Sequence, residues 1–156
     1  MYRKIILLIV LVLALTACER DDICIDETTP ELIIKFLDAA DTESTKAISN
    51  LKIKILDTEI DTLIRSGDSI FIPLRIDSDI TQLSLTNQID TQDIRTDTLS
   101  LSYERVESFV GRSCGFRIIF NNVVLQNTSN WIQNSNTVNE PQNVDNEASA
   151  HLTISH

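Results

Sequence analysis

The chain has 156 residues, of which 23 are Asp or Glu and 13 are Lys or Arg, and its formal net charge at pH 7 is −10. This length fits one domain that is large enough to bury a hydrophobic core. An acidic surface repels nucleic acid and keeps a protein in solution, so the composition argues against a nucleic-acid partner.

The first 17 residues have the pattern of a cleavable bacterial secretion signal. Arg3 and Lys4 form a basic start, and an apolar run from Ile5 to Leu15 follows it. This run is shorter than the roughly 20 residues that a membrane-spanning helix needs. The sequence therefore predicts a signal peptide over residues 1–17 and not a stable transmembrane helix.

Cys18 ends a motif that resembles the lipobox of bacterial lipoproteins. The motif consists of Leu15, the small residues Thr16 and Ala17, and the cysteine itself. In that family the cysteine thiol is joined to diacylglycerol and becomes the first residue after cleavage. We therefore expect lipid on Cys18 to anchor the protein durably, on the outer membrane of the cell envelope. The alternative is an ordinary secretory signal with an incidental cysteine.

Residues 18–30 are expected to form an acidic tether between the anchor and the domain. Glu19, Asp21 and Asp22 place three acids next to the lipidation site. This cluster resembles the acidic export tag of surface lipoproteins in the Bacteroidota, and a solvated tether is the alternative. The expected localisation is thus the outer membrane, on either its periplasmic or its cell-surface face.

Residues 31–156 are expected to form one β-rich domain, because short segments alternate apolar and polar residues. Pro73 predicts an edge strand or a bulge in its segment, and residues 104–110 are expected to hold at most a short helical turn. The pattern favours an antiparallel immunoglobulin-like β-sandwich of about seven strands, with a small barrel as the rival. The predicted strands lie around residues 32–37, 51–55, 70–76, 83–85, 99–103, 116–120 and 152–154.

Residues 126–147 are rich in Asn and Gln and predict a long polar connection, with one strand around Trp131 to Val138. Trp131 and Tyr103 are the large polar aromatic residues downstream of the leader, and such rings can stack on a sugar. Tyr103 is in phase with Leu99 and Leu101 and is therefore expected in the core. Trp131 is surrounded by polar residues, so it is the candidate ligand-binding residue.

Cys24 and Cys114 are the two cysteines that remain once Cys18 carries lipid. An oxidising envelope favours a disulfide between them. The bridge would close a loop of about 90 residues, which is worth about 4–5 kcal/mol in the chain-entropy model. Two free thiols are the alternative. A catalytic cysteine is not expected, because no His lies near either one in the sequence.

Several fragments together resemble a family of uncharacterised lipoproteins of the Bacteroidota, a domain of unknown function. The resemblance covers nearly all of the chain after the leader. It implies an envelope lipoprotein in which Cys24 is paired with Cys114, and it implies no activity. The fragments that carry it are residues 21–24, 28–30, 72–74, 113–116, 146–148 and 151–154.

The sequence contains no motif that predicts catalysis, a metal site or a cofactor. It lacks G-x-S-x-G, H-E-x-x-H, C-x-x-C and a phosphate-binding Gly loop. The leading hypothesis is a non-enzymatic binding or structural accessory module, held to the membrane by its lipid and able to contact an envelope protein. The alternatives are a lipoprotein that binds a glycan or a cation, and a hydrolase with two close carboxylates.

Overall fold

The computed structural model describes residues 2–3, 24, 28–88 and 92–156. Most of the predicted leader lies outside the described residues, and so does Cys18. No helix within the described residues has the length and apolarity needed to cross a bilayer. The described residues form nine strands: β1 (Leu32–Leu37), β2 (Ile48–Ile55), β3 (Leu63–Gly67), β4 (Ser69–Ile72), β5 (Ile80–Gln88), β6 (Ile94–Gly111), β7 (Gly115–Asn127), β8 (Asn134–Thr137) and β9 (Leu152–Ser155).

The strands form two sheets that enclose one core. One sheet has the order β4-β1-β9-β8, and the other has the order β3-β2-β5-β6-β7. Neighbouring strands are antiparallel except β1 and β9, which pair in parallel. Fully buried side chains from both sheets, such as Phe36 of β1 and Leu85 of β5, belong to the same hydrophobic cluster. The prediction of an all-β fold is therefore correct, and the described residues form nine strands where about seven were expected.

The alternation in the sequence identifies the buried face of β2 correctly. Leu51, Ile53 and Ile55 are at most 1% exposed, whereas Lys52 and Lys54 between them are exposed. This period of two is what a strand with one solvated face requires. β1 differs because apolar residues on both of its faces are largely covered, which agrees with its nearly continuous apolar sequence.

The strand predicted over residues 70–76 is shorter than expected. Ile70, Ile72 and Leu74 are buried as predicted, but Ile76 is 58% exposed because the strand ends at Ile72. Pro73 follows directly, and it has no N–H with which to continue a ladder. β4 is an edge strand of its sheet, which agrees with the edge position predicted from Pro73.

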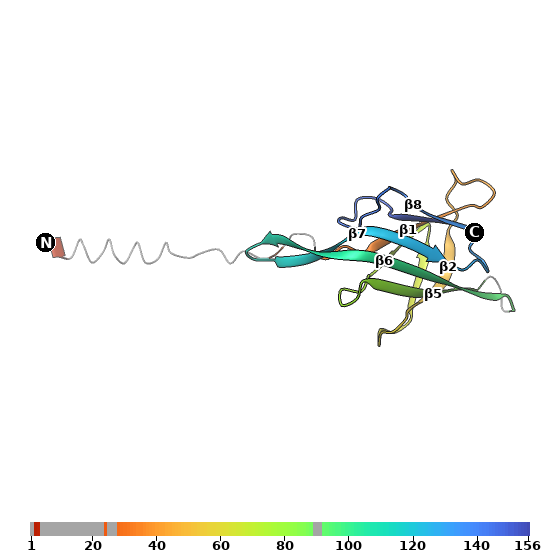
Figure 1. Ribbon diagram of the computed structural model, residues 1–156, viewed down its shortest axis with the longest axis horizontal. Helices are drawn as coiled ribbons and strands as arrows, with labels where there is room; N and C mark the ends of the chain where they lie inside the picture. Colours follow the sequence, from red (N-terminus) through yellow and green to blue (C-terminus); the bar gives the residue numbers. More distant parts are fainter. Residues whose placement is uncertain (1, 4–23, 25–27, 89–91) are drawn as a thin grey trace.

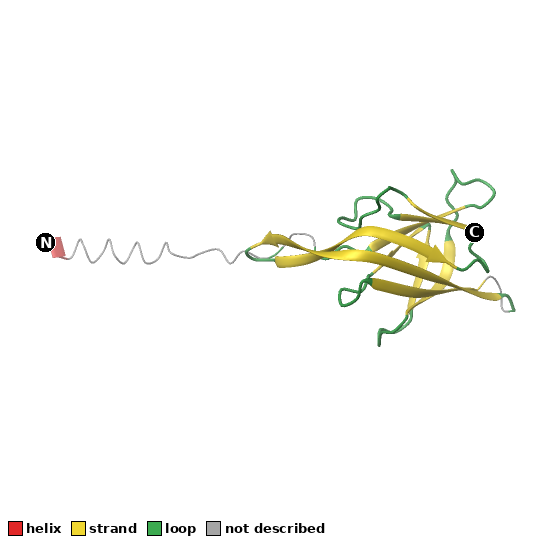
Figure 2. Ribbon diagram, viewed as in Figure 1, coloured by secondary structure: helices red, strands yellow, loops and turns green. Residues whose placement is uncertain are grey.

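β6 and β7 form a long hairpin. Residues 104–110 belong to β6, so the prediction of a short helical turn there is wrong. β5 pairs with β6 only as far as Ser102, whereas β7 accompanies β6 to Gly111. Phe120, the partner of Arg105, also bridges to Val144, so the hairpin is a two-stranded ribbon only from Val106 onward. This ribbon projects beyond the body on the side away from the C-terminus (Figures 1 and 2). Cross-strand pairing along this ribbon outweighs the weak helical preference of its charged residues.

The polar connection predicted over residues 126–147 is in part a structural element. It contains β8, close to the strand expected there. Its last part runs beside β7, where Phe120 and Val144 exchange backbone hydrogen bonds of 3.0 and 2.7 Å. Val144 and Gln142 are buried, so this part of the connection covers the core.

His151 joins the connection before β9 to the start of β1. Its Nδ1 accepts a hydrogen bond from the backbone N–H of Ile33 at 3.0 Å, and its Nε2 donates to the carbonyl of Asn146 at 3.0 Å. The ring is 4% exposed. Only the neutral ring with its proton on Nε2 makes both bonds. Burial lowers the pKa of His151 below its usual 6.5, although Asn146 and the nearby acids oppose this effect.

We expect His151 to make the protein less stable as the pH falls below about 6.5. Below that value the unfolded chain binds a proton at this residue, whereas the folded ring with its lowered pKa does not. Stability from His151 is complete above pH 6.5 and is lost as the pH falls toward the folded pKa. Urea unfolding at pH 7.5 and 5.5 measures this loss.

The matched variants are His151→Gln and His156→Gln. The loss of stability between the two pH values should shrink in His151→Gln by more than it does in His156→Gln, because His151 is the more deeply enclosed ring. An unchanged pH dependence in His151→Gln would contradict the assignment of the neutral ring.

Candidate functional site

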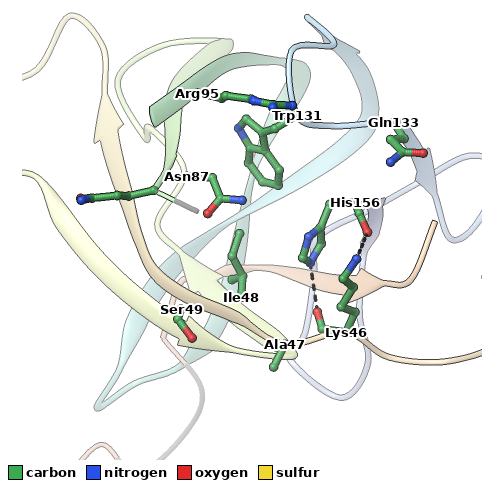
Figure 3. A pocket seen from close by; sticks show the side chains of 10 residues that line it. Lys46, Ala47, Ile48, Ser49, Asn87, Arg95, Trp131, Gln133 and His156 are labelled. Carbon is green, nitrogen blue, oxygen red and sulfur yellow. Dashed lines mark hydrogen bonds between the residues drawn. The ribbon is translucent and has the colours of Figure 1, made fainter. Parts of the chain in front are cut away.

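A cleft of about 350 Å³ lies at the end of the molecule where β6 begins. We call it the distal cleft. Its walls come from the start of β2 and the connection before it, the end of β5, the start of β6, the β7–β8 connection and the residue after β9. It is lined by Lys46, Ala47, Ile48, Ser49, Asn87, Gln88, Arg95, Trp131, Gln133 and His156 (Figure 3).

Trp131 lies at the base of the distal cleft as part of the core. Its ring is 5% exposed and makes an edge contact with the ring of His156, whose centroid is 5.9 Å away. The indole Nε1–H donates to the carbonyl of Leu85 at 3.0 Å. A ring that is this buried offers little area on which a sugar could stack. Ligand contact by Trp131 stays a prediction, and the structure places the residue where such contact would be limited.

Asp97 of β6 holds the segment that carries Trp131. Its Oδ1 accepts from the Thr128 hydroxyl at 2.6 Å and from the Asn130 N–H at 2.7 Å. Its Oδ2 accepts from the N–H groups of Trp131 at 2.8 Å and Ile132 at 2.9 Å. Burial alone would raise the pKa of Asp97, but these four donors outweigh it and lower the pKa below 3.8. The carboxylate is therefore charged and fully satisfied.

Two basic side chains on the wall of the distal cleft already have acidic partners. Lys46 Nζ donates to the backbone carbonyl of His156 at 2.7 Å and lies 3.7 Å from an Asp38 carboxylate oxygen. Arg95 binds Asp93 through two parallel hydrogen bonds of 2.8 and 2.9 Å. The positive charge of the cleft is thus partly compensated, and its effect on a ligand is reduced accordingly.

The chemistry that the distal cleft offers is hydrogen bonding. Burial lowers the pKa of His156 below 6.5, so its ring is neutral near pH 7. The side-chain amides of Asn87, Gln88 and Gln133 add donors and acceptors. Among the described residues that line the cleft, none has a carboxylate side chain. No group of three or more His, Cys, Asp or Glu side chains within the described part of the chain is arranged to hold a metal ion.

The predicted disulfide lies at the opposite end of the molecule. Cys24 is bonded to Cys114, with their Cα atoms 4.9 Å apart, and Cys114 occupies the turn between β6 and β7. Farther along, the N–H of Ile118 in β7 donates to the Thr29 hydroxyl at 3.1 Å. The bond therefore fixes a residue close to the predicted lipidation site onto the tip of the hairpin.

β6 spans the distance between these two ends. Arg95 near its start lines the distal cleft, and Phe109 near its end lies next to the hairpin turn. At about 3.3 Å per residue the strand covers about 45 Å between them. The disulfide and the distal cleft are thus at far ends of one strand.

Asp97 and His156 are two residues of this region that the sequence does not assign to a binding site. The sequence does contain a signal that Asp97 is buried. The residue is in phase with Leu99, Leu101 and Tyr103 on the buried face of β6. An acid at a core position implies a buried partner set. No sequence signal indicated His156, because an isolated histidine forms no motif with its neighbours.

The model of a family of unknown function, DUF6452, matches residues 50–156. The matched region begins within β2 and includes Cys114, the distal cleft residues of β5 and β6, and Trp131. No curated protein and no solved structure matches the chain.

Proposed function

The chain belongs to DUF6452, a family of unknown function, and from this premise we propose that it is a lipid-anchored accessory module of the bacterial cell envelope. Lipid on Cys18 holds it to the outer membrane, on the periplasmic or the cell-surface face. Its role is binding or structural and not catalytic, and an envelope protein is its expected partner. The proposal includes its membership among the lipoproteins of the Bacteroidota.

The observation that carries the proposal is the position of the Cys24–Cys114 bond. The bond attaches a residue six positions after Cys18 to the tip of the β6–β7 hairpin. A disulfide persists in an oxidising compartment such as the envelope and is rare in the cytosol. A protein held by Cys18 would therefore have its hairpin tip near the membrane and its distal cleft about 45 Å farther out, at about 3.3 Å per strand residue.

We also propose that the sandwich is immunoglobulin-like. The support is that two mainly antiparallel sheets enclose one core and that the chain crosses repeatedly from one sheet to the other. Domains of this class commonly serve in adhesion and recognition outside the cytoplasm.

The distal cleft favours a second candidate, a lipoprotein that binds a small polar ligand. Its side-chain amides and its neutral His156 can hydrogen-bond hydroxyl groups, as a glycan requires. Lys46 and Arg95 would repel a cation. Of the two ligand classes expected from the sequence, the lining thus favours a glycan over a cation.

The test of the anchor is the Cys18→Ala variant. Cells fed an alkyne-tagged fatty acid should label the wild-type protein strongly and the variant at background level, because the thiol is the attachment point. Mass spectrometry of the N-terminal peptide should show diacylglycerol on Cys18 and no residue before it. Membranes washed with carbonate should retain the wild-type protein.

Thr16→Ser is the matched control, since it keeps a small residue at the same place in the lipobox. It should be labelled and retained like the wild type. Equal labelling of Cys18→Ala, or a wild-type peptide with an intact leader, would refute the proposal.

A further inference from the structure

We propose that the tip of the β6–β7 hairpin contacts the lipid surface in which Cys18 is anchored, with Phe109 and Phe116 entering its headgroup region. This inference rests on the proposed function, because it takes Cys18 as the lipid-bearing residue. It adds a second point of contact and thereby an orientation for the domain.

Phe109 and Phe116 form an exposed aromatic pair beside the hairpin turn. They are directly opposite one another in the register of β6 and β7, with ring centroids 5.2 Å apart. Their exposed fractions are 60% and 66%, although Phe is a residue that folding usually buries. Mutual packing stabilises the ribbon, but it leaves most of both rings in water. Burial in a lipid interface would cover that remaining area.

The length of the tether brings this pair close to the membrane. Cys24 is bonded to Cys114 at the turn, so the tip cannot move away from Cys24. A chain of six residues spans at most about 20 Å when it is fully extended. Lipid on Cys18 therefore limits the tip to within about 20 Å of the bilayer surface, as estimated from that extended length. No other exposed pair of Phe side chains in the described residues is held in this way.

The charged residues of the hairpin tip itself are basic. Between Ser108 and Asn121 the charged residues are Arg112 and Arg117, and none is acidic, in a chain of net charge −10. Arg112 is exposed in the turn. A basic side chain near an anionic lipid surface contributes about 1 kcal/mol. Arg112 can therefore meet an anionic headgroup, whereas the acidic residues of the tether between Cys18 and Pro30 oppose the approach, so the contact depends on the aromatic pair.

Fluorescence quenching by brominated lipids tests the contact. The lipidated full-length protein is reconstituted in vesicles of phosphatidylethanolamine and phosphatidylglycerol with brominated acyl chains. Phe116→Trp reports on the tip, and Ile94→Trp is the matched control, since Ile94 is 58% exposed at the other end of β6. Trp131, the one natural tryptophan, supplies a buried background. We expect at least about twofold stronger quenching in Phe116→Trp, because side chains that enter the interface reach about 5–10 Å into it.

A triple variant, Phe116→Trp with Cys24→Ser and Cys114→Ser, separates the tether from the tip. Its quenching should fall, because the tip is no longer held to Cys24. Equal quenching of the Phe116→Trp and Ile94→Trp proteins, or none in either, would overturn the contact when mass spectrometry shows lipid on Cys18. A wild-type peptide without lipid would instead overturn the proposed function and this inference with it. A photo-crosslinker at Phe109 that captures a protein and no lipid in native membranes would also overturn the contact.

Discussion

Asp97→Ala should lower the free energy of unfolding by about 3–5 kcal/mol, because it leaves buried donors without a charged acceptor. Asp97 is 1% exposed and accepts from one hydroxyl and three backbone N–H groups. The N–H groups of Trp131 and Ile132 are buried, so water cannot replace the carboxylate at them. Chemical unfolding of residues 19–156, monitored by circular dichroism, measures the change.

Two further variants make the Asp97 test specific. Asp93→Ala removes a half-buried acid that is bound to the exposed Arg95, and it should cost less than about 1 kcal/mol. Thr128→Val removes one of the four donors to Asp97. Its loss in free energy of unfolding should lie between the losses of Asp93→Ala and Asp97→Ala. The emission of Trp131 should shift to longer wavelength in Asp97→Ala alone, because that variant frees the backbone of Trp131. A similar cost for the Asp97→Ala and Asp93→Ala variants would contradict the role given to Asp97.

The double variant Cys24→Ser, Cys114→Ser should lower the free energy of unfolding by about 4 kcal/mol, as expected for a bond that closes a loop of 90 residues. The main reason is that the unfolded chain gains freedom when the loop is open. In the folded state the segment around Thr29 should also loosen, and the Ile118 amide that donates to Thr29 should exchange faster with solvent.

Ser113→Ala is the control for the disulfide variant, because it changes the neighbouring exposed residue and keeps the bond. Its unfolding midpoint and its Ile118 exchange rate should match those of the unmodified protein. Alkylation of the exported protein before reduction should detect no free thiol at Cys24 or Cys114. Free thiols there, or equal midpoints for the double variant and the control, would contradict a stabilising bond.

The sequence predicts best those strands that bury one face. β2 and the first half of β6 alternate apolar and polar residues because one side of each faces the core. The outer half of the β6–β7 hairpin has no such contrast. Glu104 and Glu107 are exposed, and Phe109 is exposed as well. The β6 side of this ribbon has no fully buried face, and the prediction of a helical turn there was wrong, whereas the β7 side was predicted as a strand around residues 116–120.

The distal cleft could not be predicted because its lining comes from segments far apart in the chain. Lys46, Arg95 and His156 meet only after both sheets have formed. For Trp131, the neighbouring residues in the sequence led to a wrong expectation of the environment of the ring. Its neighbours are polar, and this suggested an open ring, but Asp97 binds those neighbours and draws the ring into the core. The pairing of the cysteines needed only their number and compartment.

The sheet that contains β1 cannot be completed until β9, the last strand of the described chain, has been made. Its neighbours are β4 on one side and β9 on the other, and the N–H of Ile33 reaches His151, 118 positions later. The other sheet needs only strands that are close in sequence, so it can assemble while the chain is still being made. Such a high contact order slows folding to milliseconds or longer. β1 can pair with β4 early, but the edge of β1 that β9 covers therefore stays open until synthesis is nearly finished, and it is the edge that a chaperone would have to protect.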